Sequence, residues 1–202
     1  MAEVYVVKLD EAMKMQVPLL SALTGLRKDK ALRYLQEEDQ IRSAVGTLLI
    51  RKFVGDGITY VHAKGKPYIV GARSFNLSHA GNYIGIAVDD HEVGFDVDCI
   101  ERCEVEIARA AFTDEEAAEV HDKESFCLAW TRKEAIAKCQ GDGLREPRKY
   151  GVTPQSDGTF LYRSEVYHAS SLIRDGHIFC IASKDGPVSL EPVLLQPKDL
   201  ID

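Results

Sequence analysis

Two acidic residues alternate with apolar ones in the segment Gly94-Phe95-Asp96-Val97-Asp98. Residues 93–99 are predicted to form a strand, and successive side chains of a strand point to opposite faces, so Asp96 and Asp98 share one face. Two neighbouring carboxylates repel each other unless water or a cation lies between them, and Mg²⁺ prefers oxygen ligands. A solvated strand edge is the alternative, because two alternating acids alone are a weak signal for a metal.

A second group lies in residues 125–139, which are predicted to form a helix. Trp130, Glu134 and Lys138 recur at four-residue spacing, so they line one face of that helix. A Glu–Lys pair at this spacing is common on helix surfaces and stabilises a helix by only about 0.2–0.5 kcal/mol. Trp130 is the only tryptophan in the sequence, however, and a large ring beside an acid and a base is typical of a cleft wall. A surface ion pair and a catalytic cleft both remain open.

A third group, Ser78 and His79, stands directly before a predicted hairpin turn at residues 80–82. A hydroxyl and an imidazole beside a glycine turn can hydrogen-bond a phosphate. An ordinary hairpin histidine is one alternative, and a serine hydrolase is another. The hydrolase is disfavoured because no G-x-S-x-G surrounds Ser78 and neighbouring strand residues point to opposite faces.

Basic residues cluster around the start of a predicted helical region: Arg27, Lys28, Lys30 and Arg33, with Lys64 and Lys66 further along. In a chain of net charge −7, this cluster could receive phosphates, and a solvated helix start is the common alternative. The acidic balance argues against a general nucleic-acid binder. The sequence also lacks the glycine-rich motifs of P-loop and dinucleotide-binding folds, which disfavours both.

The elements that must position these residues fall into two similar sets. The first set has strands at residues 4–9, 75–79, 83–88 and 93–99, and one long helix or two between 29 and 53, where apolar residues recur every three or four positions. The second set has helices at 107–120, interrupted by a cap-like Thr113, and at 125–139, followed by strands at 159–168, 170–174 and 177–183. A boundary near residue 100 predicts halves 1–100 and 101–202, and the tail from residue 186 is expected to pack loosely.

The cysteine count, the N-terminal residues and the lengths of the apolar runs indicate the cellular setting expected for the protein. The five cysteines are odd in number and form no C-x-x-C, so a reduced, cytoplasmic setting is expected. Cys99 and Cys103 have a spacing that suits a metal, but no nearby Cys/His pair completes a zinc set, and small apolar fillers are expected instead. Residues 1–10 do not resemble a signal peptide, and no run approaches the ~18 apolar residues of a membrane span.

Taken in order, these motifs resemble those of the 4′-phosphopantetheinyl transferase superfamily, in its two-domain monomeric class whose type member activates surfactin synthetase. The matching segments are Gly65-Lys66-Pro67, residues 75–79, residues 94–98, Phe112-Thr113-Asp114-Glu115-Glu116, residues 130–135, Lys138 and Gly143-Leu144. The stretch 27–42 also resembles the family's phosphate-contacting helix start. The segments are short, but together they span most of residues 25–145 in the family's order.

The resemblance implies an α+β fold of two similar halves related by a pseudo-two-fold axis, each with a small antiparallel sheet and a long helix. It places the active site in the cleft between them. The implied reaction is Mg²⁺-dependent transfer of the phosphopantetheine arm of coenzyme A to a serine of an acyl, peptidyl or aryl carrier protein, with release of 3′,5′-ADP. Mn²⁺ could replace Mg²⁺, and the protein would act as a monomer.

The resemblance also implies roles for individual residues. The metal ligands would be Asp96, Asp98 and Glu134. Lys138 would contact the pyrophosphate. The acceptor serine must also lose a proton, and Glu134 is the best-placed candidate base for it, directly or through a metal-bound water. The coenzyme A contacts would be Arg27, Lys30, Lys66, Ser78, His79, Asp96 and Lys138.

Two positions depart from the family pattern, which usually has Glu where this chain has Asp98 and commonly Ser where it has Ala80. Basic residues expected at the rim of a carrier site are Lys133, Arg145, Arg148 and Lys149, the last three with a solvated loop as the alternative. A non-catalytic module that binds coenzyme A or a carrier, and a Mg²⁺-dependent phosphohydrolase, remain the rival functions.

Overall fold

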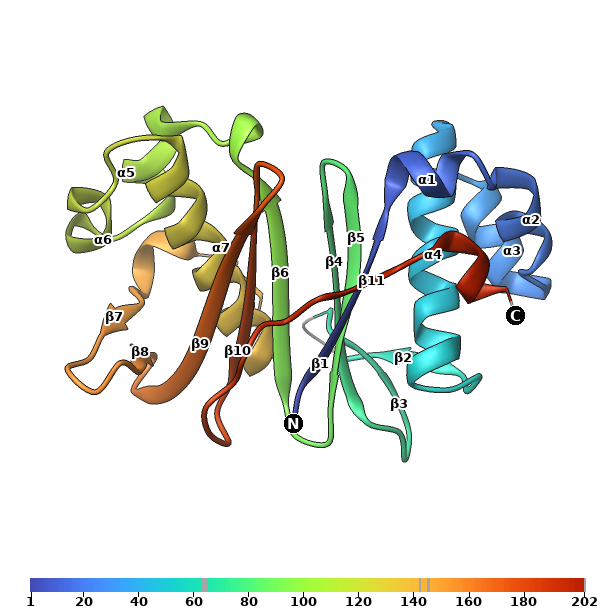
Figure 1. The fold of residues 1–202 in the computed structure, drawn as a ribbon. Coiled ribbons are helices and arrows are strands. Elements are labelled where there is room, and N and C mark those ends of the chain that lie inside the picture. Colours follow the sequence, from blue (N-terminus) through green and yellow to red (C-terminus); the bar gives the residue numbers. More distant parts are fainter. Residues whose placement is uncertain (63–64, 142, 145, 202) are drawn as a thin grey trace.

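The computed structural model describes residues 1–62, 65–141, 143–144 and 146–201. Two sheets pack face to face, and helices cover the outer face of each, which gives four layers (Figure 1). This arrangement confirms the predicted α+β class. Within the described ranges, no helix is both long enough and apolar enough to cross a lipid bilayer.

The helices and strands follow the chain in the order printed in Figure 1. The helices are α1 (Leu9–Met13), α2 (Gln16–Ser21), α3 (Gly25–Leu32), α4 (Glu37–Phe53), α5 (Ala108–Ala111), α6 (Asp114–Ala118) and α7 (Lys123–Gln140). The strands are β1 (Glu3–Lys8), β2 (Thr59–Val61), β3 (Pro67–Ile69), β4 (Ser74–Ala80), β5 (Tyr83–Asp89), β6 (Val93–Cys99), β7 (Thr153–Pro154), β8 (Phe160–Tyr162), β9 (Glu165–Arg174), β10 (His177–Ser183) and β11 (Val193–Leu195). Short 3₁₀ turns occupy Ile100–Arg102, Val105–Ile107, Pro147–Lys149 and Pro197–Leu200.

The pairing of the strands divides the chain differently from the expected halves 1–100 and 101–202. The first sheet has the order β11-β1-β5-β4 and the second β6-β10-β9-β8-β7, while β2 and β3 form a separate hairpin. Strand β6 pairs with β10, so the boundary between the sheets falls before β6. Strand β11 pairs with β1 in parallel, so the first sheet is mixed rather than purely antiparallel.

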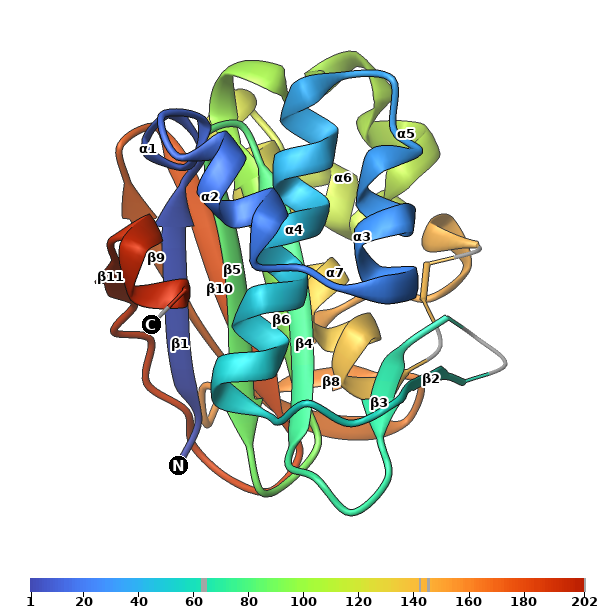
Figure 2. The same ribbon diagram turned by 90° about the vertical axis from the view of Figure 1, so that its right-hand side faces the viewer.

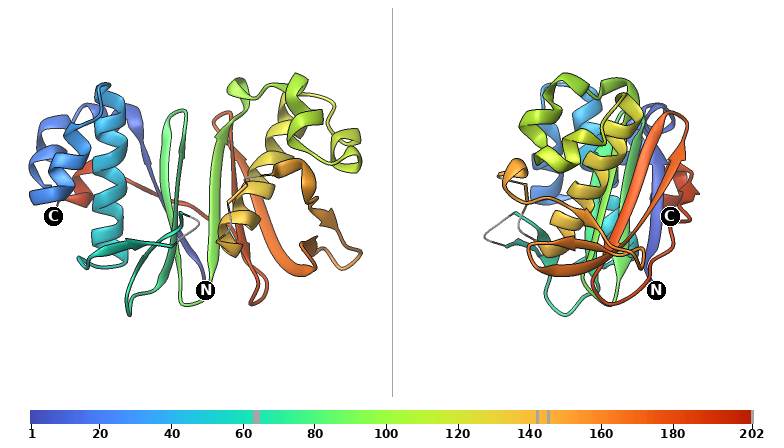
Figure 3. Two further views of the ribbon diagram at one scale, coloured as in Figure 1. Left: turned by 180° about the vertical axis from the view of Figure 1, so that it is seen from behind. Right: turned by 90° about the vertical axis from the view of Figure 1, so that its left-hand side faces the viewer.

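The C-terminal tail is not loosely packed, contrary to the expectation. It crosses back from the second sheet to the first, where β11 covers the edge of β1 (Figure 3). Leu190 and Leu200 are only 8% and 3% exposed. Leu200 belongs to the cluster beneath α4 and Leu190 to the cluster between the sheets, so apolar burial at both ends holds the tail in place.

The helical region before residue 53 is two helices rather than one. Helix α3 ends at Leu32 and α4 begins at Glu37; α3 packs against α4, and α4 lies against the first sheet (Figure 2). Leu35, in the break, is 95% exposed, whereas Ile41, Leu48 and Leu49 are fully buried. The apolar periodicity therefore identified the buried face of α4 correctly. It wrongly counted Leu32 and Leu35, at the end of α3 and in the break after it, among the buried positions.

Strands β4 and β6 are edge strands of different sheets and lie next to each other at the centre of the molecule (Figure 1). Side chains of β4 link them, because Asn76 Oδ1 accepts a hydrogen bond of 3.1 Å from the Phe95 amide, and Ser78 Oγ accepts one of 3.3 Å from the Val97 amide. Asn76 and Ser78 are both buried. The junction fixes the distance between the two strands that carry the site.

Gly94 allows helix α7 to lie close against β6. A Cβ atom at this position would stand 1.9 Å from the Ala135 carbonyl oxygen and 2.4 Å from the Cys139 amide nitrogen. No side chain fits at such distances without moving the helix backbone. The glycine therefore sets how closely the face of α7 that carries Glu134 approaches Asp96.

Candidate functional site

Five chemically active side chains from three elements line a cavity of about 300 Å³. They are Ser78 from β4, Asp96 and Asp98 from β6, and Glu134 and Lys138 from α7. Leu77, His79 and Trp130 also line it. The structure thus brings together the acidic face of the predicted strand and the Trp–Glu–Lys face of the predicted helix, and it confirms Trp130 as part of a cleft wall. We call this the carboxylate cavity.

Lys138 and Asp96 form the tightest contact in the carboxylate cavity. The Lys138 ammonium donates to Asp96 Oδ1 at 2.6 Å and to Ser78 Oγ at 3.3 Å, while Ser78 Oγ donates to the same Asp96 oxygen at 2.7 Å. Burial lowers the pKa of Lys138, but the attraction of Asp96 and Glu134 outweighs it and raises the pKa above its usual value. The lysine therefore remains charged.

Glu134 and Asp98 carry the remaining negative charge. Burial raises the pKa of Glu134, and Asp96 and Asp98 raise it further, whereas Lys138, whose Nζ lies 4.0 Å away, opposes the shift. Burial likewise raises the pKa of Asp98, against a hydrogen bond of 2.7 Å that its Oδ1 accepts from the Cys99 amide. Three carboxylates thus face a single ammonium group.

The donor set of the carboxylate cavity fits a hard divalent cation. Three carboxylates whose charges destabilise one another would be relieved by Mg²⁺, which prefers oxygen ligands. Asp96, Asp98 and Glu134 do not form a group whose ligand atoms all lie within 4.8 Å of one another. Lys138 holds Asp96 and the Cys99 amide holds Asp98 Oδ1, so coordination by all three carboxylates requires these contacts to rearrange.

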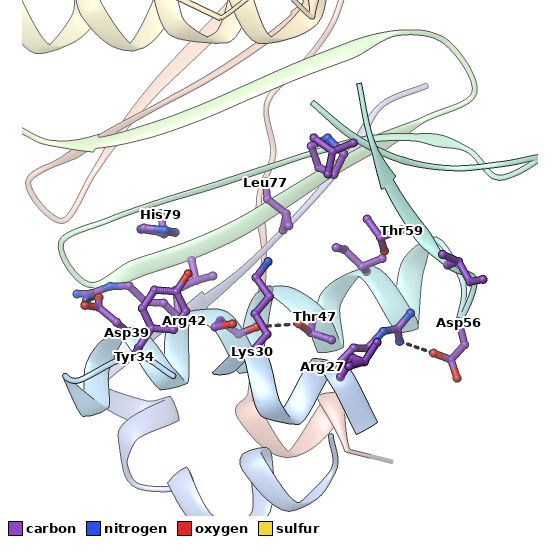
Figure 4. Close-up of a pocket in the computed structure, with 18 of the residues that line it drawn as sticks. Arg27, Lys30, Tyr34, Asp39, Arg42, Thr47, Asp56, Thr59, Leu77 and His79 are labelled. Carbon is purple, nitrogen blue, oxygen red and sulfur yellow. Dashed lines mark hydrogen bonds and ion pairs between the residues drawn. The ribbon is translucent and has the colours of Figure 1, made fainter. Parts of the chain in front are cut away.

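A larger cavity of about 960 Å³ adjoins the carboxylate cavity and shares Leu77, Ser78 and His79 with it. Arg27, Lys30 and Arg42 also line it (Figure 4). We call it the basic cavity, although Asp39 and Asp56 lie on its wall as well. Its cations come from α3 and α4, which stand in front of β4.

The cations of the basic cavity differ in how far they are already paired. Arg27 bonds to the Asp56 carboxylate and donates to the Gly57 carbonyl at 2.7 Å. Arg42 bonds to Glu38 and Asp39, both at 2.9 Å, whereas Lys30 points from α3 toward Leu77 (Figure 4). Partial desolvation lowers the pKa of His79, and the charges of Arg42 and Lys138 add to this. The imidazole is therefore neutral near pH 7 and can donate one hydrogen bond.

Several predicted residues lie away from both cavities. Lys66 is absent from the described lining residues of either; it bonds to the Glu92 carboxylate and to the Val93 carbonyl, the latter at 3.0 Å. Lys133 was expected at a basic rim, which is wrong, because its side chain is fully buried and bonds to Glu116 at 2.6 Å.

Of the other basic residues, Arg148 and Lys149 make surface ion pairs with Asp114 and Glu146. Arg145 and Lys64 lie outside the described residues.

The sequence analysis missed Arg42 as an individual site residue. A usable signal exists in helix α4, where polar and small residues recur every three or four positions along a helix whose other faces are largely apolar. They are Asp39, Arg42, Ser43, Gly46 and Thr47, and all of them line the basic cavity. The apolar residues of α4, among them Ile41, Leu48 and Leu49, are buried in the core cluster, which leaves this stripe to line the cavity.

Comparisons with known proteins agree on one family. Residues 92–182 match the family model of the 4′-phosphopantetheinyl transferase superfamily, and this segment contains both the Asp96–Asp98 strand and the Glu134–Lys138 helix. A 4′-phosphopantetheinyl transferase of Bacillus subtilis is 29% identical over 179 residues, which cover 80% of this chain and 76% of the relative.

Two further relatives carry the same description. The 4′-phosphopantetheinyl transferase gsp of Aneurinibacillus migulanus is 29% identical over 160 residues, covering 71% of this chain and 68% of the relative. The 4′-phosphopantetheinyl transferase Sfp of Bacillus subtilis (strain 168) is 25% identical over 198 residues, which cover 86% of this chain and 88% of the relative. The family match over residues 92–182 and the relatives show that this chain is similar to members of the 4′-phosphopantetheinyl transferase superfamily.

Proposed function

We propose that this protein transfers the phosphopantetheine arm of coenzyme A to a serine of an acyl, peptidyl or aryl carrier protein and releases 3′,5′-ADP. The observation that carries the proposal is the pair of adjoining cavities, one rich in carboxylates and one rich in cations, which share Ser78 and His79. Coenzyme A has a pyrophosphate in its middle and a 3′-phosphate at its nucleotide end. A site for it needs both kinds of surroundings side by side.

The basic cavity would hold the 3′-phosphate end. Arg27, Lys30 and Arg42 supply positive charge there, and His79 supplies a neutral donor where the two cavities meet. Ser78 would donate to phosphate once its hydroxyl turns away from Asp96. Charge-assisted hydrogen bonds to phosphate are about twice as strong as neutral ones. Lys66 would join these contacts only after its ion pair with Glu92 opens.

The carboxylate cavity would hold the pyrophosphate together with Mg²⁺, for which Mn²⁺ could substitute. Asp96, Asp98 and Glu134 would be the protein ligands. When bound, the cation supplies charge neutralisation on the phosphate oxygens. Asp98 has a shorter side chain than the glutamate usual in the family, so its contact would be made either by a shift of β6 or through a water molecule.

Two residues of α7 would accept the proton of the acceptor serine and stabilise the negative charge of the leaving group. The acceptor serine oxygen forms a bond to the phosphorus that bears the pantetheine arm, and the bond from this phosphorus to the 3′,5′-ADP oxygen breaks. Glu134 would take the serine proton, and the raised pKa of its carboxyl makes it a better base than an ordinary glutamate. Lys138, which remains charged, would stabilise the leaving phosphate.

The decisive experiment incubates the protein with Mg²⁺, coenzyme A and an apo carrier protein and follows the carrier by mass spectrometry. Addition of one phosphopantetheine to the carrier serine is expected. Binding of coenzyme A or carrier without addition would instead identify a non-catalytic module. Release of phosphate without a carrier would identify a phosphohydrolase. A panel of apo carriers from fatty-acid, polyketide and non-ribosomal-peptide synthesis then selects the partner.

Arg42→Ala is expected to weaken coenzyme A binding about 10- to 100-fold, since a hydrogen bond to a charged group contributes about 1.5–3 kcal/mol. Calorimetry with coenzyme A and with 3′-dephospho-coenzyme A measures the effect. The loss should appear with the first ligand and largely vanish with the second.

The matched control for Arg42→Ala is Arg73→Ala, which removes a surface arginine paired with Glu3 and Asp90 away from both cavities. Equal affinities of Arg42→Ala and the unmodified protein for coenzyme A would rule out a phosphate contact at this position.

The affinity for Mg²⁺ is expected to rise with pH over a range above about pH 4, where carboxyl groups usually titrate. The pKa values of Asp98 and Glu134 are raised, so protons remain bound to these carboxyls at a higher pH than usual and compete with the cation. As the pH falls through the raised pKa values, the affinity should fall. Titration with Mn²⁺, observed by electron paramagnetic resonance, gives the profile, and a pH-independent affinity would contradict this account.

A further inference from the structure

A second group of potential metal ligands shares Asp98 with the carboxylate cavity. Ligand atoms of Asp98, Cys103 and Cys127 all lie within 4.8 Å of one another. They come from the end of β6, the residue after the 3₁₀ turn Ile100–Arg102, and the first half of α7. Cys103 is 5% exposed and Cys127 is fully buried.

The two sulfur atoms make only weak contacts in this structure. Cys103 Sγ donates to the Cys99 carbonyl at 3.5 Å, and Cys127 Sγ lies 3.9 Å from Thr131 Oγ1. The Thr131 hydroxyl already donates to the Cys127 carbonyl at 2.7 Å, so it is not a strong donor to the sulfur. Both cysteines are free thiols. The two thiols also hydrogen-bond each other, and sulfur hydrogen bonds are weak. The pair therefore consists of soft ligand atoms held only by weak contacts.

The spacing of the three groups is close to that of a zinc site. With Zn–S distances of about 2.3 Å and Zn–O distances of about 2.0–2.2 Å, the ligand atoms of a tetrahedral ion lie about 3.4–3.8 Å apart. Contraction by no more than about 1.4 Å from the 4.8 Å limit would therefore close the group around an ion. Thiolates select Zn²⁺ over Mg²⁺, so this site and the carboxylate cavity would prefer different cations.

We propose that Asp98, Cys103 and Cys127 form a site for a thiophilic divalent cation such as Zn²⁺, with a water molecule as the fourth ligand. On binding, each thiol releases its proton to solvent, and two thiolates and one carboxylate surround the ion. We call the group of Asp98, Cys103 and Cys127 the thiolate site. Asp98 also lines the carboxylate cavity, so a cation bound at the thiolate site withdraws this side chain from Mg²⁺. The thiolate site stands on the geometry alone, whereas the competition with Mg²⁺ rests on the proposed function.

Cys99 provides a matched control, because it neighbours Asp98 in sequence but faces the opposite side of β6. The Cβ of Cys99 lies 3.2 Å from the position that a Cβ on Gly81 would occupy, in the turn between β4 and β5. Its side chain is partly exposed. Replacement of Cys99 therefore removes a nearby thiol without removing a proposed ligand.

The first test titrates the purified protein, kept reduced with a phosphine, with Co²⁺ as a spectroscopic substitute for Zn²⁺. Thiolate-to-cobalt charge-transfer bands and tetrahedral d–d bands are expected. Cys103→Ser and Cys127→Ser should lose the charge-transfer bands, and Cys99→Ser should keep them. Absence of these bands from the unmodified protein, or their persistence in Cys103→Ser, would overturn the site.

The second test needs no substitution, because replacement of the buried Cys127 could unfold the protein. X-ray absorption of the Zn²⁺-loaded protein should show two sulfur atoms in the first coordination shell. A shell of oxygen and nitrogen only would place Zn²⁺ in the carboxylate cavity and overturn the proposal. A Cys103–Cys127 disulfide in the protein loaded under reducing conditions would do the same.

Competition is tested by adding Mg²⁺ to the Co²⁺-loaded protein. Loss of the charge-transfer bands with rising Mg²⁺ is expected if both sites use Asp98. Unchanged bands would show that the two sites do not share Asp98. The carrier assay, done with Mg²⁺ as the sole metal, tests transfer independently of this result. Failure of this inference and failure of the proposed function are therefore distinguishable.

Discussion

Glu134→Gln is expected to abolish phosphopantetheine transfer, by about 10³-fold or more, while coenzyme A still binds. The amide keeps the size of the side chain but neither accepts the serine proton at neutral pH nor contributes a negative charge to the cation site. The basic cavity, which would hold the nucleotide end, does not include Glu134 among its lining residues. Single-turnover transfer followed by mass spectrometry gives the rate, and calorimetry gives the affinity for coenzyme A.

The control for this variant is Glu124→Gln, an exposed acid in the first turn of the same helix, which should transfer at the normal rate. A titration of Mg²⁺ separates the two roles of Glu134. If the residue serves only as a metal ligand, high Mg²⁺ should restore much of the rate, whereas loss of the base is not recovered this way. Near-normal turnover of Glu134→Gln at ordinary Mg²⁺ would refute both roles.

Lys133→Met is expected to lower the free energy of unfolding by about 3 kcal/mol, because it leaves a largely buried carboxylate without its cation. Glu116 Oε2 accepts from the Lys133 ammonium and from the Thr113 amide at 2.9 Å, and its other oxygen accepts from the Val152 amide at 2.8 Å. The pair joins α6 and the segment before β7 to α7. Urea denaturation followed by circular dichroism measures the change.

A double-mutant cycle separates the ion pair from packing. Lys133→Met combined with Glu116→Gln removes both charges, so the double variant should be more stable than the sum of the two single losses predicts. Lys149→Met, which breaks the exposed pair with Glu146, should change stability by less than about 1 kcal/mol. Equal losses for Lys133→Met and Lys149→Met would show that the buried pair does not stabilise the fold.

Much of the candidate site could be predicted from the sequence, because its geometry is local to single elements. Alternation along a strand places Asp96 and Asp98 on one face, and four-residue spacing places Glu134 beside Lys138. The strand at residues 93–99 has the predicted bounds, and the capping residue Thr113 interrupts the helical region where expected. The cavity that unites these two faces is a property of the packing of α7 against β6.

Residues whose roles depend on distant partners could not be placed in this way. Lysine is usually a surface residue, yet Lys133 is buried against Glu116 and the ring of Phe112. Lys66 fits a phosphate contact by its motif, but Glu92 holds it elsewhere. The tail shows no strong periodicity, and its order comes from pairing with β1, almost the whole length of the chain away.

The sequence by itself determined the α+β class, the acidic strand, the Trp130–Lys138 helix face and the resemblance to a family, because each depends on short-range periodicity or on motifs. Only the tertiary structure decided that β6 joins the second sheet and that Arg42 faces the basic cavity. It also placed the thiol of Cys103 beside that of Cys127, which is distant in the sequence. Periodicity reports which face of an element is buried, whereas long-range packing selects the group that lies against it.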